Sequence, residues 1–316
     1  LRRMIEHEQQ RLASQYGDPV DDRGEPADLV TLALGKFGGR EPNYHSDLDA
    51  IFLYSADGET RRRVGGHRAT LTNQQFFNQL TQSVIERINQ PGPSGRLYEL
   101  DSRLRDTGEE GVWAMTIQEF LDRFHQGTAP LWQLFALCKA RAVSGPHALR
   151  RKVDAAVANV LVGTHWNPSM ASDLREMRMR MQRTARVENL KRGEGGTVDV
   201  EFVAQALTLR HANQTPKIIQ AGTTASLEAL AKAGHLSEEQ ALELISGYRT
   251  LRRVEANLRL MNTLARHELP DDDHSMKNLA FLMNEADPAM IQAQCQQTRH
   301  RNREIFDDVF EKLIAE

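Results

Sequence analysis

The sequence predicts an α+β domain followed by an all-helical domain. Short apolar runs rich in strand-forming residues occur in the first part of the chain, each bounded by glycine, proline or asparagine. From about Thr116 onward, apolar residues instead recur at helical spacing between short polar breaks, and no strand-like alternation is evident. The 316 residues also suit roughly two domains, which we expect over residues 1–160 and 161–316.

The first part is expected to combine helices with a small sheet. The expected elements are, in order, a helix ending near Tyr16, strands over 29–34 and 48–54, a helix over 74–90 and a strand over 96–104. A loop rich in glycine, proline and asparagine separates the first two strands, so we expect these strands to pair. The run from Pro91 to Gly95 ends the second helix.

The second part is expected to contain helices only. The clearest one spans about Glu238 to Leu264, where apolar residues recur at spacings of three and four. Another, from Asp173 to Leu190, carries a run of arginines. Such a run is usually a solvated face, and in this chain it is also a candidate contact for an acidic protein partner or for the leaving phosphates. A further helix is expected to begin at Thr197, with Asp199 and Glu201 in its first turn.

Composition excludes several classes of protein. The formal net charge is −3, so bulk charge gives no reason to expect nucleic-acid binding. No apolar run is long enough for a membrane span, and no secretory signal opens the chain, so we expect a cytoplasmic protein that binds no membrane. The two cysteines, Cys138 and Cys295, are far apart, which excludes a disulfide framework.

Two aspartates begin the second strand. Alternate side chains of a strand share a face, so Asp47 and Asp49 project together while Leu48 points to the core. Two carboxylates at this spacing are suited to Mg²⁺, which also binds substrate phosphates. Gly38 and Gly39, just upstream, would let the backbone approach those phosphates, and loop N–H groups there would hold the anion.

The third strand offers a further carboxylate. Asp101 and Arg103 share its charged face, so if it neighbours the second strand, Asp101 completes a two-metal site and Arg103 donates to phosphate oxygens. Each feature also has a plain structural interpretation: a solvated strand end, a tight turn, or a strand with one wet face. Their combination, in this order, is typical of polymerase-β-type nucleotidyltransferases, which the chain resembles here.

The resemblance extends to a narrower family. The blocks GKFGGREPNYHSDLDAIFLY (35–54), GRLYELDSRLRDTG (95–108) and GGTVDVEF (195–202) resemble the signature blocks of the bifunctional glutamine synthetase adenylyltransferase/deadenylylase family. The resemblance implies a polymerase-β-like domain with a small mixed sheet, followed by a helical bundle. It also implies Asp47, Asp49 and Asp101 as catalytic residues and ligands of two Mg²⁺ ions, with Gly38, Gly39 and Ser46 as the loop that binds the triphosphate of ATP.

The implied reaction is transfer of AMP from ATP to a tyrosine hydroxyl of glutamine synthetase, with release of diphosphate. We add the hypothesis that Asp101 is the base that activates the tyrosine. Leu48, the block LYELDSRLR and Asp199 are more similar to the adenylylating C-terminal half than to the deadenylylating half. Asp106 departs from the family, which usually carries proline there.

Other functions remain open at this point. They are the deadenylylating half, which removes AMP by phosphorolysis, a uridylyltransferase of nitrogen signalling, and a non-catalytic module that binds a regulator. The resemblance further implies the PII signal protein and glutamine as regulators. Asp199 and Glu201 have two interpretations, a helix start stabilised by the macrodipole or a role in orienting the acceptor.

Overall fold

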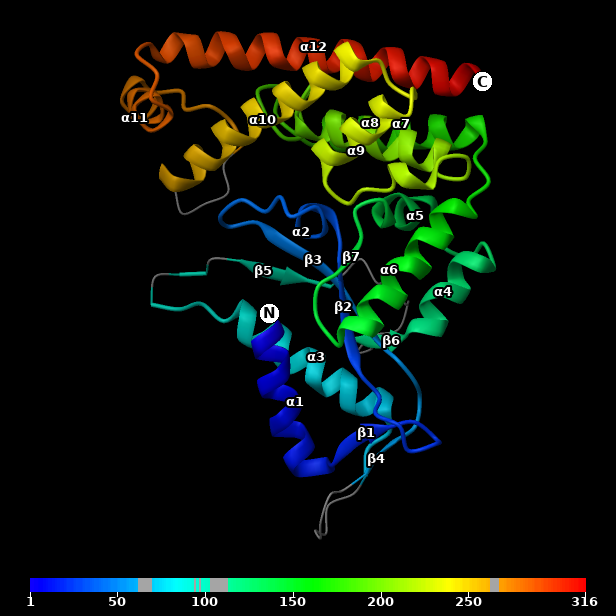
Figure 1. Cartoon of the computed structure of the whole chain (residues 1–316). Coiled ribbons are helices and arrows are strands. Elements are labelled where there is room, and N and C mark those ends of the chain that lie inside the picture. The colour runs from blue at the N-terminus through cyan, green and yellow to red at the C-terminus, as the bar shows by residue number, and fades with distance from the viewer. Residues whose placement is uncertain (62–69, 94, 97, 103–112, 262–266) are drawn as a thin grey trace. The chain divides into compact units, whose positions relative to one another are not determined.

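The structure is a computed structural model that describes residues 1–61, 70–93, 95–96, 98–102, 113–261 and 267–316 (Figure 1). It divides into two compact units. The first consists of Leu1–Pro42 and Asp47–Val160, and the second of Asn43–Ser46 and Leu161–Glu316. The expected α+β architecture is confirmed, because the sheets lie in the first part of the chain and helices make up the second.

The first unit is built on a small mixed sheet. Its elements are α1 (Arg2–Tyr16), β1 (Asp18–Val20), β2 (Leu29–Ala33), α2 (Gly35–Gly38), β3 (Asp47–Tyr54), β4 (Glu59–Arg61), α3 (Asn73–Asn89), β5 (Glu99–Asp101), β6 (Ala114–Thr116), α4 (Ile117–His125), α5 (Leu131–Leu137), β7 (Arg141–Ala142) and most of α6 (His147–Val162). The strand order is β5-β3-β2-β7, with β6 also paired to β3. β2 pairs antiparallel with β3, whereas β5 and β6 run parallel to β3.

One face of this sheet packs on α1 and α3. The buried cluster joins Ala50, Phe52 and Tyr54 of β3 to Phe76 and Phe77 of α3, and the rings of Tyr54 and Phe77 stack with centroids 5.0 Å apart. α3 begins with a capping box, in which Gln75 N donates a hydrogen bond to Thr72 Oγ1 and Thr72 N donates one to Gln75 Oε1. Because Ala50, Phe52 and Tyr54 all belong to this cluster, the even-numbered residues of β3 face the core and its odd-numbered residues face the opposite side of the sheet.

The second unit is helical. Its elements are α7 (Pro168–Arg183), α8 (Thr197–His211), the 3₁₀ turn η2 (Pro216–Ile218), α9 (Thr223–Lys232), α10 (Glu238–Met261), α11 (Asp273–Met283) and α12 (Pro288–Ala315). The long α12, coloured orange to red in Figure 1, packs against α7, α8, α10 and α11. Leu251, Val254 and Leu258 of α10 form one core cluster with residues of α11 and α12. Within the described part of the chain, no helix is both long enough and apolar enough to span a membrane.

Several expectations about single elements need correction. The third strand was expected over 96–104, but β5 spans only Glu99–Asp101. The helix expected over 173–190 is α7, which begins earlier, at Pro168 capped by Asn167, and ends at Arg183. The expected absence of strands after Thr116 is wrong, because β7 pairs with the edge of β2 over Arg141–Ala142. A two-residue strand is too short to show alternation in a sequence.

Candidate active site

Asp47 and Asp49 lie at the solvent-exposed beginning of β3. Asp47 is exposed and Asp49 is half-buried, whereas β3 is fully buried from Ala50 to Tyr54. Leu48 packs against the core cluster on the α1 and α3 side. The two aspartates therefore share the other face of the sheet, as the alternation of the strand predicts.

Asp101 lies directly beside Asp49. In the parallel pair β3 and β5, Asp49 is the register partner of Asp101 and Leu48 is the partner of Leu100. Leu100 is buried in the same core cluster as Ala50, so Asp101 projects from the face that carries Asp49. Neighbouring strands lie about 5 Å apart, so the two carboxylates are close enough to act on one bound group.

Asn89, the last residue of α3, fixes the position of β5. Its Oδ1 accepts a hydrogen bond from Leu100 N at 2.7 Å, and its Nδ2 donates to Leu100 O at 3.1 Å. The amide thereby mimics a further strand on the outer edge of β5 and orients the residue that precedes Asp101. Sequence reasoning missed Asn89, because an asparagine at a helix end is an ordinary feature with no motif around it.

The donor set of this face suits Mg²⁺. Among the residues described, no three histidine, cysteine or acidic side chains form a cluster that could itself hold a metal ion. Mg²⁺ is usually held by one or two carboxylates, with waters and substrate phosphates as its other ligands. Carboxylates at register positions on two neighbouring strands provide that type of incomplete oxygen site.

The loop expected between the first two strands contains a single helical turn, α2. Gly35 has a φ of 51°, and a Cβ there would lie 2.5 Å from Asp49 Oδ2, so only glycine leaves room for that carboxylate. A Cβ on Gly38 would lie 1.8 Å from Lys139 O. The N–H groups of Gly38 and Gly39 donate to Leu34 O and Gly35 O. Gly38 therefore has a packing role, and the two amides are engaged within the turn.

Two basic residues support this turn. Arg141 Nε donates to Gly38 O at 2.9 Å, and its Nη2 donates to Phe37 O at 3.2 Å. Burial lowers the pKa of Arg141, with a smaller contribution from nearby Arg40. Lys139 Nζ forms an ion pair with Glu41 at 3.0 Å, and both side chains are largely buried. Both cations stabilise the backbone around α2, and neither lies in a block that the sequence analysis singled out.

Ser46 belongs to the second unit. Its hydroxyl oxygen accepts a hydrogen bond from Asn43 N at 3.0 Å and another from Arg259 Nη1 at 3.1 Å. Only 7% of Ser46 is exposed. Arg103, the remaining predicted nucleotide ligand, lies outside the described residues.

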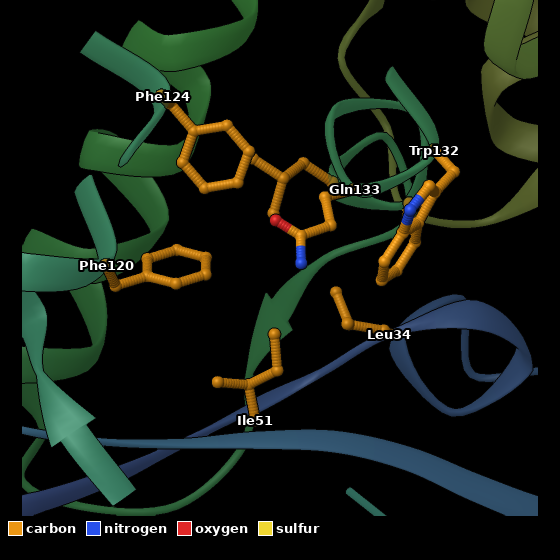
Figure 2. Close-up of a pocket in the computed structure, with 8 residues that line it drawn as sticks. Leu34, Ile51, Phe120, Phe124, Trp132 and Gln133 are labelled. Carbon is orange, nitrogen blue, oxygen red and sulfur yellow. The ribbon is translucent and has the colours of Figure 1, made fainter. Parts of the chain in front are cut away.

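A small apolar pocket lies on the Asp49 face of the sheet, and its lining includes Ile51 of β3. Figure 2 shows it between Leu34 and Ile51 on the sheet side and Phe120, Trp132 and Gln133 from α4 and α5. Ile51 follows Asp49 by two residues, so their Cα atoms are about 7 Å apart along the same face of β3. The cavity volume of about 10 Å³ has room for about one water molecule. The buried Gln133 Nε2 has no hydrogen-bond partner in the part of the chain that the structure describes, and a water there would satisfy it.

Asp199 and Arg178 form a fully buried ion pair inside the second unit. Arg178 Nε donates to Asp199 Oδ1, and Gly195 N donates to Asp199 Oδ2 at 2.7 Å. Burial raises the pKa of Asp199 and lowers that of Arg178, and the attraction between their charges opposes both effects. The expectation that the arginine run is a solvated face is therefore wrong at Arg178. Glu201 accepts a hydrogen bond from Tyr248 OH at 3.0 Å.

Comparisons with known proteins show which families the two parts of the chain resemble. Residues 1–156 match the family model described as glutamate-ammonia ligase adenylyltransferase. Residues 169–314 match the model described as GlnD PII-uridylyltransferase.

Two curated relatives carry the name bifunctional glutamine synthetase adenylyltransferase/adenylyl-removing enzyme. The protein from Thioalkalivibrio sulfidiphilus is 33% identical over 95% of this chain, and the protein from Shewanella woodyi is 32% identical over 88%. The chain spans 31% and 29% of the lengths of these relatives. The resemblance seen in the sequence blocks is thus confirmed, because residues 1–156 match the adenylyltransferase model and both relatives are similar to this chain over most of its length.

Proposed function

We propose that this chain is a protein adenylyltransferase that moves AMP from ATP to a tyrosine hydroxyl of glutamine synthetase and releases diphosphate. The observation that carries the proposal is the register of Asp49 with Asp101, beside Asp47, on one face of the sheet. Similarity to the relatives supports the same chemistry, because they are named for adenylylation of glutamine synthetase and removal of the adenylyl group. Residues 1–160 would form the catalytic domain and residues 161–316 the helical domain.

The reaction requires positioning and charge neutralisation more than covalent chemistry. Asp47, Asp49 and Asp101 would hold Mg²⁺, with two ions in the complete site. Bound Mg²⁺ would neutralise the phosphates and lower the barrier to displacement at the α-phosphorus. Ser46 and the glycine turn would contact the triphosphate. Gly38 and Gly39 would contribute through their lack of a side chain, since their N–H groups donate hydrogen bonds within and next to α2.

The proton and the leaving group can be followed through the step. The tyrosine oxygen forms a bond to the α-phosphorus, and the bond from that phosphorus to the diphosphate oxygen breaks. Asp101 would accept the phenolic proton, because we expect it to be the one of the three aspartates nearest to the tyrosine that receives AMP. Arg103 remains a proposed ligand of the phosphate oxygens.

We assign the chain to the adenylylating half on the sequence features given above. The deadenylylating half, which would use phosphate to release ADP, is the main alternative. The match of residues 169–314 to a uridylyltransferase model favours a second candidate, transfer of UMP. That match covers the helical unit, however, whereas the aspartates lie in the part that matches the adenylyltransferase model. By family resemblance we also propose a cytoplasmic location, with the PII protein and glutamine as regulators.

One experiment separates these functions. The chain is incubated with Mg²⁺, unmodified glutamine synthetase and ATP labelled at the α-phosphate, with UTP labelled in the same way in a parallel reaction. Label from ATP on a tyrosine of glutamine synthetase supports the proposal, provided that the Asp47→Asn/Asp49→Asn variant transfers none. Label from UTP alone would favour the second candidate.

The deadenylylating alternative is tested with adenylylated glutamine synthetase and inorganic phosphate. Release of ADP there, without any forward transfer, would assign the chain to the other half. Failure of both directions in the presence of the PII protein and glutamine would leave a non-catalytic module and contradict the proposal.

A further inference from the structure

Arg259 of α10 is an almost fully buried arginine that contacts the segment directly before Asp47. It is 5% exposed. Its Nη1 donates to Tyr44 O at 2.6 Å and to Ser46 Oγ at 3.1 Å, and both partners belong to the same compact unit as α10. A guanidinium remains protonated at any physiological pH, so a positive charge is placed against this segment.

A network of side chains orients Arg259. His267 Nε2 lies 3.5 Å from Arg259 Nη2, and His267 Nδ1 lies 3.1 Å from Glu255 Oε1. Arg252 Nη1 donates to the other oxygen of Glu255 at 2.9 Å. Glu255 is fully buried and precedes Arg259 by one helical turn. The guanidinium is therefore held between its own helix, residue 267 and the 43–46 segment, which restricts its rotamers.

The segment that Arg259 holds has a conformation that needs support. His45 has a φ of 55°, which is in the left-handed region that residues with a side chain adopt infrequently. Arg259 binds the residues on both sides of His45, at Tyr44 O and Ser46 Oγ. These two hydrogen bonds stabilise the left-handed turn. Asp47 follows the turn directly in the sequence.

The same contacts determine what the Ser46 hydroxyl can do. Its oxygen accepts from Asn43 N and from Arg259 Nη1, which uses both lone pairs. The hydroxyl proton is then left to donate, and a negatively charged oxygen is the acceptor that gives the strongest hydrogen bond. The adjacent guanidinium charge favours an anion at the same place.

We propose that Arg259 is a positioning residue for the triphosphate of a magnesium nucleoside triphosphate. It orients the Ser46 hydroxyl as a phosphate donor and fixes the backbone that leads into Asp47. This inference rests on the proposed function, because it assigns a role within the same nucleotide site.

The test measures nucleotide binding by titration calorimetry, without glutamine synthetase, on the whole chain. The variants are Arg259→Gln, Arg259→Lys, Ser46→Ala and the Arg259→Gln/Ser46→Ala double variant. Arg249→Gln is the matched control, since Arg249 lies on the same helix with its side chain 67% exposed. Mg-ATP, AMP and adenosine are the ligands, and thermal unfolding verifies that each variant is folded.

We expect Arg259→Gln to weaken Mg-ATP binding by about 10- to 100-fold, the usual effect of losing a hydrogen bond to a charged group. Arg259→Lys should fall between Arg259→Gln and the unchanged chain, because it keeps the charge but not both hydrogen bonds. AMP and adenosine binding should change by less than about threefold, because they lack the β- and γ-phosphates. Adding Ser46→Ala to Arg259→Gln should weaken binding by less than the product of the single effects.

Three results would overturn the inference. The first is that a folded Arg259→Gln or Arg259→Lys variant binds Mg-ATP with the same affinity as the Arg249→Gln control. The second is that Arg259→Gln weakens adenosine binding as much as Mg-ATP binding, and the third is that the effects of Arg259→Gln and Ser46→Ala on Mg-ATP affinity multiply in the double variant. If the unchanged chain binds no Mg-ATP, the proposed function fails together with the inference. If the unchanged chain binds Mg-ATP and the Arg259 variants bind it as tightly as the Arg249→Gln control does, the proposed function stands and the role of Arg259 is wrong.

Discussion

Asp49 on β3 and Asp101 on β5 are register partners on parallel neighbouring strands, although 52 positions separate them in the chain. The partly buried Leu48 and the buried Leu100, also register partners, fix the orientation of both aspartates. A slip of one residue in either strand would turn a carboxylate into the core, so burial of the leucines enforces the register. The hydrophobic core thereby determines the geometry of the proposed metal site.

Replacing either aspartate by asparagine should abolish the activity that depends on this pair. We expect Asp49→Asn and Asp101→Asn each to lower AMP transfer by about 100- to 1,000-fold, because the amide cannot neutralise the metal charge. Glu99→Gln is the matched control, since Glu99 forms an ion pair with Arg96 at the exposed edge of β5. Transfer rates at saturating Mg-ATP measure the effect. Loss of activity in Glu99→Gln equal to that in Asp101→Asn would contradict the assignment.

Gly35→Ala should impair the site more than it impairs the fold. The left-handed backbone costs about 1–2 kcal/mol for a residue with a Cβ, and the Cβ would displace the Asp49 carboxylate, which lies 2.5 Å from its position. A misplacement of this kind costs about 100-fold in transfer rate. Gly127→Ala provides the control, because Gly127 has a φ of 67° and nothing within 4 Å of an added Cβ.

Both glycine variants should therefore lose similar free energy of unfolding, measured in urea, while only Gly35→Ala loses transfer. Equal transfer rates in the two variants would show that Gly35 is required by the fold alone.

The Arg178–Asp199 pair should be essential for stability. Arg178→Met leaves Asp199 as a buried charge without its main partner, so we expect a loss of about 3–5 kcal/mol in the free energy of unfolding. Arg180→Met, on the same helix, removes an exposed contact with Glu176 and should cost within about 0.5 kcal/mol. The Arg178→Met/Asp199→Leu variant should recover part of the loss, because no buried charge remains.

The same variants separate the two interpretations of Asp199. A structural role predicts normal transfer per folded molecule in the double variant. A folded double variant that binds Mg-ATP but does not modify glutamine synthetase would instead support a role in orienting the acceptor.

Acid should destabilise the chain through His211. Its ring stacks on the ring of His235, with centroids 3.8 Å apart. Burial lowers the pKa of His211 to about 4, and the charges of His235 and Arg210 contribute in the same direction, whereas Glu316 opposes the shift. The unfolded chain takes up this proton near pH 6.5. The folded chain resists protonation, so stability is complete above about pH 6.5 and falls as the pH decreases toward 4.

His211→Gln should flatten this part of the pH profile of stability, as measured by urea unfolding between pH 4 and 7. His300→Gln, at an exposed position on α12, should leave the profile unchanged. A profile that is the same in His211→Gln and the unchanged chain would exclude His211 as the source.

The sequence alone determined the fold class, the alternation that puts Asp47 and Asp49 on one face, and the resemblance to glutamine synthetase adenylyltransferases. These features are local, because strand alternation, helical periodicity and signature blocks are properties of short segments. It also predicted that Asp101 would complete the group if the third strand neighboured the second, and the pairing of β3 with β5 confirms that condition.

Only the tertiary structure decided which long-range partners support the site. Asn89 brackets β5, Arg141 holds the carbonyls of α2, and Arg259 holds the segment before Asp47 across 213 positions of sequence. The tertiary structure also pairs Arg178, which lies in the run of arginines expected to be a solvated face, with Asp199. Such pairings depend on which elements pack together, because a charged side chain can be buried only where the fold supplies its partner.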